Sequence, residues 1–217
     1  MNPRLLAALS VYLVTDRPLC LGRPLDEVVF QAVAGGCTMV QLREKTTDTR
    51  EFVELARALR ARLAPLGVPL LINDRVDVAL AAGVDGVHVG QSDMRPADVR
   101  RLMGPDVIVG LSAESLETLR AAQDEPVDYL GVGPAYPTST KKDVKGSPWG
   151  PEGYARAVAE SRLPVVAIGG IDAPRARAVM ASGVAGVAVV SCICSAPSPE
   201  AAARELAAAV ARGRAGR

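Results

Sequence analysis

The sequence predicts a single (β/α)₈ TIM barrel formed by residues 1–217, and three observations support this fold. Short β-branched runs alternate with amphipathic helical stretches along the whole chain, as in a parallel sheet covered by helices. One unit recurs at 34–42, 81–89 and 181–189, where a helical pattern ends at a glycine and a strand begins after a short turn. No change in composition divides the 217 residues. An open, doubly wound sheet is the alternative fold.

The buried runs place strands at 11–15, 39–43, 69–73, 86–89, 107–112, 129–133, 164–168 and 186–190. Helical periodicity lies between them, for example at 49–63, 115–123 and 173–182. Gly36, Gly83 and Gly183 are expected to close three helices, because glycine readily adopts the left-handed conformation that ends a helix. The chain is shorter than the roughly 250 residues typical of this barrel, so most connections must be tight.

The composition argues against several classes of function. The formal net charge is +1, from 25 Lys and Arg against 24 Asp and Glu, so no overall field favours nucleic acid or an anionic membrane. Aromatic residues make up only 3%, too few for the stacking surfaces of single-strand binders. The four cysteines lack the spacing of a disulfide framework, and Cys192 and Cys194 lack the partners of a zinc site.

No targeting segment or membrane-spanning run is apparent in the sequence. We therefore expect a cytoplasmic protein with reduced thiols, because free thiols persist in that compartment. The oligomeric state stays open, a homo-oligomer included.

One connection is long. Residues 134–150 read PAYPTSTKKDVKGSPWG, with no apolar periodicity. A loop of this length inside a compact domain is usually an active-site loop or a disordered one. Because it follows the sixth strand, a barrel would place it on the catalytic face. Its hydroxyl and lysine side chains predict a mobile lid over an anionic ligand.

Cationic side chains end the second strand. Side chains alternate along a strand, so Gln41, Arg43 and Lys45 are expected to face the barrel interior while Leu42 faces the helices. An inward Arg and Lys are costly to bury unless an anion meets them. A planar fork beside a compact point charge suits a diphosphate. A salt bridge to Glu44 or another carboxylate is the alternative.

Asp74 and Asp93 follow the third and fourth strands directly. Parallel strands end at the same edge of a barrel, so the two carboxylates are expected to lie close together beside the Arg and Lys. Mg²⁺ prefers carboxylate, water and phosphate oxygens, so together they predict a magnesium site. Taken singly, each aspartate could instead cap the helix that follows it.

His88 is the only histidine of the chain, and the valines on either side of it are expected to face the helices. His88 should therefore point into the barrel. A hydrogen-bonded core histidine is the preferred interpretation, and a catalytic acid–base group is the alternative.

The ends of the last two strands predict a second anion site. Phosphate sites in these barrels often form from the loops after strands seven and eight and a short helix. Gly169 and Gly170 would let backbone N–H groups approach a phosphate, and Ser191 could donate its hydroxyl. Two anion sites at one barrel mouth, one of them metal-assisted, suit an enzyme that joins two phosphorylated small molecules with loss of diphosphate.

With these residues in place, the chain resembles the thiamine-phosphate synthase family over nearly its whole length. The motifs that carry the resemblance are VQLREK (40–45), NDRVDVAL (73–80), GVHVGQSD (86–93), GLS (110–112), GPAYPTSTK (133–141) and AIGGI (167–171). The resemblance implies a barrel enzyme that condenses 4-amino-2-methyl-5-hydroxymethylpyrimidine diphosphate with a thiazole phosphate, either hydroxyethylthiazole phosphate or its carboxylated form. The products would be thiamine phosphate and diphosphate, formed by a dissociative displacement.

The resemblance also implies roles for individual residues. Asp74 and Asp93 would hold Mg²⁺ as the cofactor. The pyrimidine diphosphate would contact Gln41, Leu42, Arg43, Glu44, Lys45, Asn73, Ser112 and Lys141, of which Arg43, Lys45, Ser112 and Lys141 would be catalytic. The thiazole phosphate would contact Thr138, Ser139, Thr140, Gly170, Val190 and Ser191.

Two other functions are weighed against the synthase. A thiazole tautomerase is similar in fold, but it needs an acid–base group and no metal. This chain has the two aspartates, and residues 110–114 read GLSAE, without the histidine that the tautomerase family carries there. A non-catalytic barrel that binds a phosphorylated ligand would tolerate loss of the aspartate pair or the loop lysine, and this chain has both.

Overall fold

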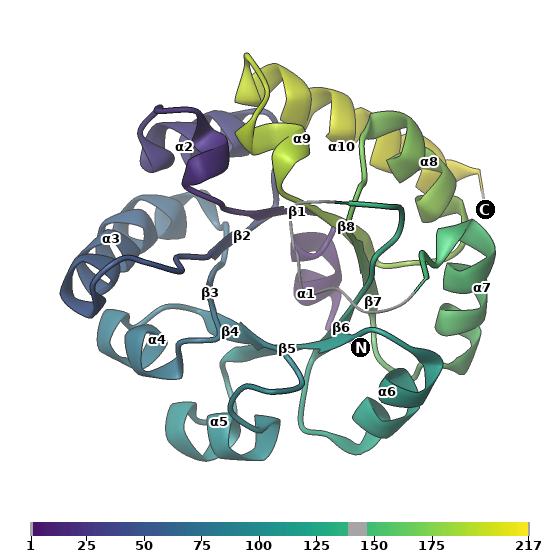
Figure 1. Ribbon diagram of the computed structural model, residues 1–217, viewed down its shortest axis with the longest axis horizontal. Helices are drawn as coiled ribbons and strands as arrows, with labels where there is room; N and C mark the ends of the chain where they lie inside the picture. Colours follow the sequence, from purple (N-terminus) through teal and green to yellow (C-terminus); the bar gives the residue numbers. More distant parts are fainter. Residues whose placement is uncertain (1, 139–146, 217) are drawn as a thin grey trace.

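The computed structural model describes residues 2–138 and 147–216, and its centre is a closed parallel barrel (Figure 1). The strands are hydrogen-bonded in chain order, and the first pairs with the last. They are β1 Val11–Val14, β2 Met39–Leu42, β3 Leu70–Asn73, β4 Gly86–Val89, β5 Ile108–Ala113, β6 Tyr129–Val132, β7 Val165–Ile168 and β8 Gly186–Val189. The predicted (β/α)₈ fold is confirmed, and each strand lies within about one residue of its expected position.

Most of the helices surround the barrel on its outer side, whereas α1 lies across one end (Figure 1). The α-helices are α1 Pro3–Ala8, α2 Leu25–Ala34, α3 Thr49–Leu63, α4 Val76–Ala82, α5 Pro96–Met103, α6 Leu116–Ala121, α7 Gly150–Glu160, α8 Ala173–Ala181, α9 Ser191–Cys194 and α10 Pro199–Ala215. Short 3₁₀ turns cover Pro18–Cys20, Ala64–Leu66 and Ala122–Asp124. Among the helices that the structure describes, none is both long and apolar enough to cross a membrane.

Side chains along each strand alternate between two apolar clusters. On β1, Val11 and Leu13 pack outward against the helices, whereas Tyr12 and Val14 pack inside the barrel. Since the strands are covered on both faces, they read as continuous apolar runs rather than as alternating ones. The same alternation sends Gln41 inward and Leu42 outward, as expected from the sequence.

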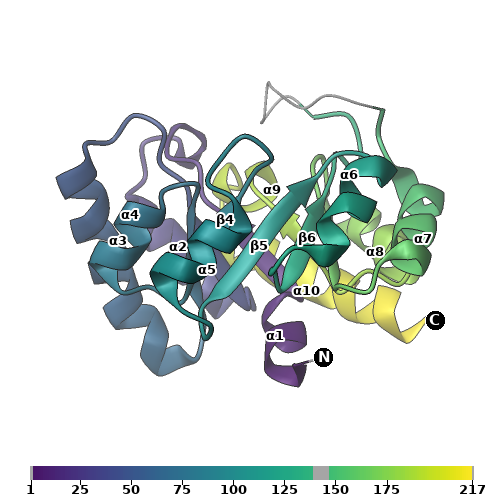
Figure 2. The same cartoon turned by 90° about the horizontal axis from the view of Figure 1, so that it is seen from below.

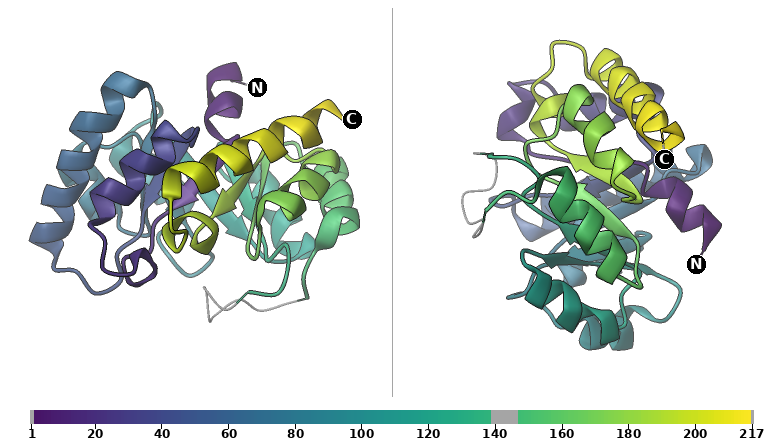
Figure 3. Two further views of the ribbon diagram at one scale, coloured as in Figure 1. Left: turned by 90° about the horizontal axis from the view of Figure 1, so that it is seen from above. Right: turned by 90° about the vertical axis from the view of Figure 1, so that its right-hand side faces the viewer.

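The two ends of the barrel are closed differently. Helix α1 lies at the end where the strands begin, and residues 134–138, which follow β6, lie at the opposite end (Figure 2). Leu9, directly after α1, is part of the inner cluster. Helix α10 packs between α2 and α8 on the outside (Figure 3). A cavity opens at the end where the strands finish, which is where the active sites of such barrels lie.

The predicted helix-closing glycines have left-handed backbones. Gly83 is itself the C-cap of α4 with φ 65°, and Gly36 and Gly183 follow the caps of α2 and α8 with φ 110° and 100°. The N-cap interpretation of the two aspartates is wrong. Helix α4 begins after Arg75 and α5 after Arg95, and neither Asp74 nor Asp93 caps a helix.

Gly186→Ala is expected to destabilise the barrel strongly. A Cβ at Gly186 would overlap the backbone carbonyl of Leu9, which a side-chain movement cannot relieve. Forcing atoms into a packed core typically costs about 1–3 kcal/mol or more. Gly22→Ala is the control. Gly22 has a φ of 81°, so alanine there is strained in its backbone, but an added Cβ would meet no other atom. Urea unfolding would measure the free energy of unfolding of both variants. An equal loss of stability in the two would contradict a steric clash at Gly186.

Candidate active site

A cavity of about 520 Å³ opens where the strands end, and all eight strands or the segments after them line it. Of the predicted site residues, those whose side or main chains line this cavity are Gln41, Arg43, Lys45, Asn73, Asp74, Asp93, Ser112, Thr138, Gly170, Val190 and Ser191. The predicted residues Ser139, Thr140 and Lys141 lie outside the described residues. The structure therefore gathers most of the predicted site in one place.

Leu42 and Glu44 do not line the cavity. Leu42 is fully buried in the outer cluster, between the strands and the helices. The Glu44 carboxylate accepts hydrogen bonds from Arg17 Nε at 3.1 Å and from Thr47 Oγ1 at 2.7 Å. Alternation along β2 and its extension turns both side chains away from the ligand space, so only their backbone atoms could take part in the predicted binding.

The two cations after β2 face the cavity and each has a carboxylate partner. Arg43 Nη1 lies 3.0 Å from Asp16 Oδ2, and Lys45 Nζ lies 3.2 Å from Asp74 Oδ2. The alternative prediction, a salt bridge to Glu44 or another carboxylate, is thus confirmed, and the carboxylates are those of Asp16 and Asp74. The Lys45 side chain is 56% exposed, so its pair adds little to stability. Both cations stay at the cavity wall, where an anion could reach them.

Asp74 has an unusual backbone for a residue other than glycine. Its φ is 61°, in the left-handed region that aspartate tolerates better than most side chains. Its Oδ2 also accepts a hydrogen bond from Asn73 Nδ2 at 2.6 Å. The turn at Asp74 starts directly at the end of β3 and aims the carboxylate at Lys45. Strained backbone of this kind is common at functional sites.

Asp93 approaches Asp74 from the loop after β4. Its Oδ2 accepts a hydrogen bond from the backbone N–H of Gly90 at 2.7 Å. Burial raises the pKa of Asp93, and the nearby Asp74 carboxylate raises this pKa further, against the opposing effects of Gly90 and Lys45. A cation bound beside Asp93 would offset this effect and favour its charged form.

The donor set at this place fits Mg²⁺. The described residues hold no group of three or more His, Cys, Asp or Glu side chains that could enclose a metal. Mg²⁺ usually keeps several waters and is bound by one or two carboxylates together with phosphate oxygens from a substrate. A pair of aspartates beside cationic side chains matches that description better than it matches a zinc site, which usually has three or four protein ligands with Cys or His among them.

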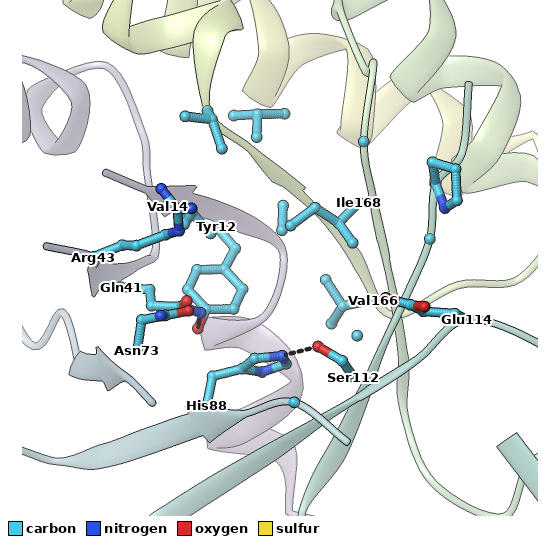
Figure 4. A pocket seen from close by; sticks show the side chains of 18 of the residues that line it. Tyr12, Val14, Gln41, Arg43, Asn73, His88, Ser112, Glu114, Val166 and Ile168 are labelled. Atoms are coloured by element: carbon cyan, nitrogen blue, oxygen red, sulfur yellow. Dashed lines mark hydrogen bonds between the residues drawn. The ribbon is translucent and has the colours of Figure 1, made fainter. Parts of the chain in front are cut away.

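A chain of hydrogen bonds crosses the floor of the cavity. Gln41 Nε2 donates to Tyr12 Oη at 2.7 Å, and the Tyr12 and Tyr129 hydroxyls lie 2.9 Å apart. His88 Nδ1 is 2.9 Å from Tyr129 Oη, and His88 Nε2 is 2.9 Å from Ser112 Oγ. Figure 4 shows His88 pointing to Ser112, with Tyr12 and Gln41 beside them. His88 points into the barrel and is hydrogen-bonded, as predicted.

Inward-facing glycines make room for this chain. A Cβ at Gly110 on β5 would overlap the rings of Tyr129 and His88. One at Gly131 on β6 would lie 2.8 Å from His88 Cε1. Large rings from β4 and β6 therefore fill the space that small residues of β5 and β6 leave, which is how barrel interiors pack.

The opposite wall of the cavity is made by the ends of β7 and β8. Gly169 and Gly170 have φ values of 102° and 64°, and Val190 and Ser191 lead into the short helix α9. A Cβ at Gly170 would lie 2.7 Å from the Pro137 carbonyl oxygen, so the chain after β6 and the chain after β7 touch here. The Gly170 carbonyl accepts a hydrogen bond from Arg175 Nη1 at 2.8 Å, which fixes the turn.

The described ends of the long loop are tied to the barrel. The backbone N–H groups of Ala135 and Tyr136 donate to the carbonyls of Ile168 and Gly169 at 2.9 and 3.1 Å. On the return, Trp149 N–H donates to the Pro134 carbonyl at 2.9 Å. Thr138 is thereby held at the cavity. The predicted lid spans residues 134–150, and its middle part, residues 139–146, lies outside the described part of the chain.

All four cysteines are free thiols, as expected. Burial raises the pKa of Cys37 to about 12 and that of Cys192 to about 11. The pKa of Cys194 is raised by its hydrogen bond with Cys20 and by burial. Thiols that stay protonated near neutral pH are poor nucleophiles, because the thiolate is the reactive form.

Some cavity residues had no predicted role. Tyr12, Tyr129, Gln91 and Glu114 line the cavity, and Asp16 holds Arg43. Tyr12 and Tyr129 could have been found, because each is flanked by apolar residues and alternation points it inward. The partner of Arg43 could not, because it depends on how β1 and β2 align.

Comparison with known proteins agrees with this site. The family model for thiamine monophosphate synthase matches residues 11–193. A thiamine-phosphate synthase from Solidesulfovibrio magneticus is 61% identical over 94% of this chain and 97% of its own. One from Albidiferax ferrireducens is 51% identical over 93% of this chain and 91% of its own.

Among solved structures, a thiamine phosphate pyrophosphorylase from Pyrococcus furiosus superposes with a TM-score of 0.88. It is 38% identical, and the match covers 97% of this chain and 99% of that one. Fold, cavity and relatives agree, and the non-catalytic alternative is set aside. The chain belongs to the thiamine monophosphate synthase family and is a transferase of thiamine biosynthesis.

Proposed function

We propose that the enzyme condenses 4-amino-2-methyl-5-hydroxymethylpyrimidine diphosphate with a thiazole phosphate. One observation supports this most directly: a single cavity has a carboxylate pair and two cations on one wall, and a glycine turn with Ser191 on the other. The first wall suits a metal-bound diphosphate and the second a phosphate monoester. A tautomerase would have no use for the aspartate pair.

The diphosphate is proposed to lie against the segment after β2. Arg43 offers a planar pair of donors and Lys45 a compact charge. Asp16 holds Arg43 in position through a 3.0 Å ion pair, so little rotamer freedom is lost when the anion binds. Lys141, from the loop outside the described residues, is proposed to add a third cation.

Asp74 and Asp93 are proposed to hold Mg²⁺. The bound ion would neutralise charge on the diphosphate oxygens as this group leaves. Asn73 and Lys45 hydrogen-bond the Asp74 carboxylate at 2.6 and 3.2 Å and orient it towards that position. The Gly90 N–H does the same for Asp93 at 2.7 Å.

The thiazole phosphate is proposed to lie between the ends of β7 and β8. Because Gly170 has no side chain, the backbone N–H groups there can come close to the phosphate, and the Ser191 hydroxyl can donate a hydrogen bond to it. Thr138 reaches the same cavity from the segment after β6. Ser139 and Thr140, outside the described residues, are proposed to complete this subsite. The cavity gives no preference between the plain and the carboxylated thiazole.

The chemistry is proposed to be dissociative. The C–O bond to the diphosphate breaks first and leaves a pyrimidine methylene cation, and the thiazole nitrogen then donates its electron pair to that carbon. Such a reaction depends on stabilising the departing anion, and it needs no general base. Arg43 and Lys45 would bind the growing charge more tightly than the ground state, which is what lowers a barrier. Ser112 would fix the pyrimidine.

The test is to incubate the purified protein with both substrates and Mg²⁺ and to measure thiamine phosphate and diphosphate together. Equal amounts of the two products are expected, and neither should form when one substrate is omitted. Rearrangement of the thiazole without diphosphate release would instead support the tautomerase, and binding without turnover would contradict an enzyme.

We also propose that the enzyme works in the cytoplasm. Its four thiols are free, and three of them are almost fully buried, where oxidation would disturb packing. A reducing compartment suits such a protein. Cell fractionation with an antibody against the chain would test this, and recovery with the membrane or the secreted fraction would contradict it.

A further inference from the structure

We propose that Tyr12 and Tyr129 are positioning residues that couple Gln41 to Ser112 through one directional chain of hydrogen bonds. This proposal rests on the proposed function in one respect, namely that Gln41 and Ser112 contact the pyrimidine ring. The chain runs Gln41, Tyr12, Tyr129, His88, Ser112, with successive distances of 2.7, 2.9, 2.9 and 2.9 Å.

The direction of the chain follows from counting hydrogens. Tyr12 and Tyr129 are 1% and 0% exposed, and burial raises the pKa of each phenol, Tyr12 to about 12, so each keeps its one hydrogen. Gln41 Nε2 donates to Tyr12, whose own hydrogen then goes to Tyr129. Tyr129 must pass its hydrogen to His88 Nδ1, and a buried phenol hydrogen without an acceptor would be costly.

The direction fixes the tautomer of His88 and the role of Ser112. Because Nδ1 accepts, the neutral imidazole carries its hydrogen on Nε2 and donates it to Ser112 Oγ. The Ser112 hydroxyl hydrogen is then left to point at a ligand. At the other end, Gln41 uses one of its two Nε2 hydrogens on Tyr12, and its Oε1 is an acceptor. The two ends thus present opposite polarities.

This opposition defines which rings suit the site. A 4-aminopyrimidine carries a hydrogen-bond donor on its amino group and an acceptor at its ring nitrogens, and the chain offers one acceptor and one donor. A 4-oxopyrimidine replaces the amino donor with a carbonyl acceptor. If the Gln41 amide turned to offer Nε2, every hydrogen bond in the chain would reverse and Ser112 would become an acceptor. With the chain intact, Ser112 therefore donates only while Gln41 Oε1 is the acceptor at the other end, and a second donor could come only from the remaining Nε2 hydrogen of Gln41.

The tautomer can be measured directly, because His88 is the only histidine of the chain. Protein made without a histidine tag and labelled with ¹⁵N-histidine gives the signals of one imidazole. We expect hydrogen on Nε2 and a bare Nδ1 in the free enzyme. Hydrogen on Nδ1, alone or together with Nε2, would overturn the direction. The measurement needs no substrate, so it stands even if the proposed reaction fails.

Ligand discrimination tests the coupling. The wild-type enzyme is expected to bind the phosphorylated 4-aminopyrimidine alcohol about 10–100-fold more tightly than its 4-oxo analogue, the effect of one unpaired buried group. Tyr129→Phe keeps the ring and removes the link, so this ratio should fall to within a few-fold of one, and the His88 signals should show a tautomer mixture. An unchanged ratio and tautomer would overturn the positioning role.

A double-mutant cycle between Tyr12→Phe and Ser112→Ala separates coupling from direct contact. In the described part of the chain, the hydrogen bonds that join the two side chains run through Tyr129 and His88. If the chain couples them, Ser112→Ala should weaken aminopyrimidine binding several-fold less in Tyr12→Phe than in the wild type. Effects that simply multiply would mean that each residue acts alone, and the proposal would be wrong.

Tyr154→Phe is the matched control. Tyr154 is also fully buried, and its hydroxyl donates one hydrogen bond, to the Val132 carbonyl at 2.7 Å, outside the cavity lining. Its loss should lower stability as Tyr129→Phe does. It should leave the amino-to-oxo ratio and the His88 tautomer unchanged, and a change in either would overturn the proposal, because general loosening would then explain the effect.

Discussion

Asp74→Ala is expected to lower Mg²⁺-dependent turnover by roughly 10²–10³-fold, the usual cost of removing one strong electrostatic element from a transition state. Asp74 and Asp93 are close enough for Asp74 to raise the pKa of Asp93. With one carboxylate gone, the remaining one cannot offset the charge of a divalent ion, and the dependence of diphosphate affinity on Mg²⁺ should weaken in parallel. Calorimetric titration of diphosphate, with and without Mg²⁺, measures this separately from turnover.

The fold should survive this change. The ion pair of Asp74 with Lys45 is partly exposed and is worth about 0–1 kcal/mol. Alanine is strained at a φ of 61°, so Asp74→Asn is the better second variant, because asparagine tolerates this conformation and removes only the charge.

Asp77→Ala serves as the control for Asp74. Asp77 stands three residues further on, in the first turn of α4, and pairs with Arg75 outside the cavity. It should retain nearly full activity. If Asp74→Asn turned over normally in Mg²⁺ and in EDTA alike, the metal assignment would be wrong.

The sequence predicted the barrel well because its signals are local. Each strand is a short β-branched run bounded by turn residues, and each closing glycine, such as Gly83, follows a helical pattern directly. Alternation then decided which side chains of β2 face the cavity. These rules need only neighbouring residues, and they succeeded for Gln41, Arg43 and Lys45.

The sequence could not predict contacts that depend on how distant strands align. The link between Tyr12 and Tyr129 spans 117 positions, and it exists only because the barrel closes with both side chains at the same level. The choice of Asp16 rather than Glu44 as the partner of Arg43 is of the same kind. Helix α1 was also missed, because its six residues are too few to show a periodic pattern.

The two walls of the cavity should give different kinetic phenotypes. Arg43→Ala is expected to lower kcat by roughly 10²–10³-fold, because Arg43 is assigned to the diphosphate, whose charge grows as it leaves. Lys141 lies in the part of the loop outside the described residues, and Lys141→Ala is expected to lower kcat to a similar extent. Arg17→Ala is the control. Arg17 is the other arginine near this wall, but it pairs with Glu44 away from the cavity, so its loss should change kcat by less than about threefold.

Ser191→Ala should act on binding alone. Ser191 is assigned to a phosphate that stays unchanged throughout the reaction, so its hydrogen bond is equally strong in the ground and transition states, and uniform binding of this kind alters KM without altering kcat. One hydrogen bond to a charged group, at about 1.5 kcal/mol, predicts a roughly tenfold higher KM for the thiazole phosphate. Steady-state kinetics with each substrate varied in turn would measure both variants. If Ser191→Ala abolished kcat while Arg43→Ala raised only the KM for the thiazole, the two walls would have to exchange roles, even though the family assignment would stand.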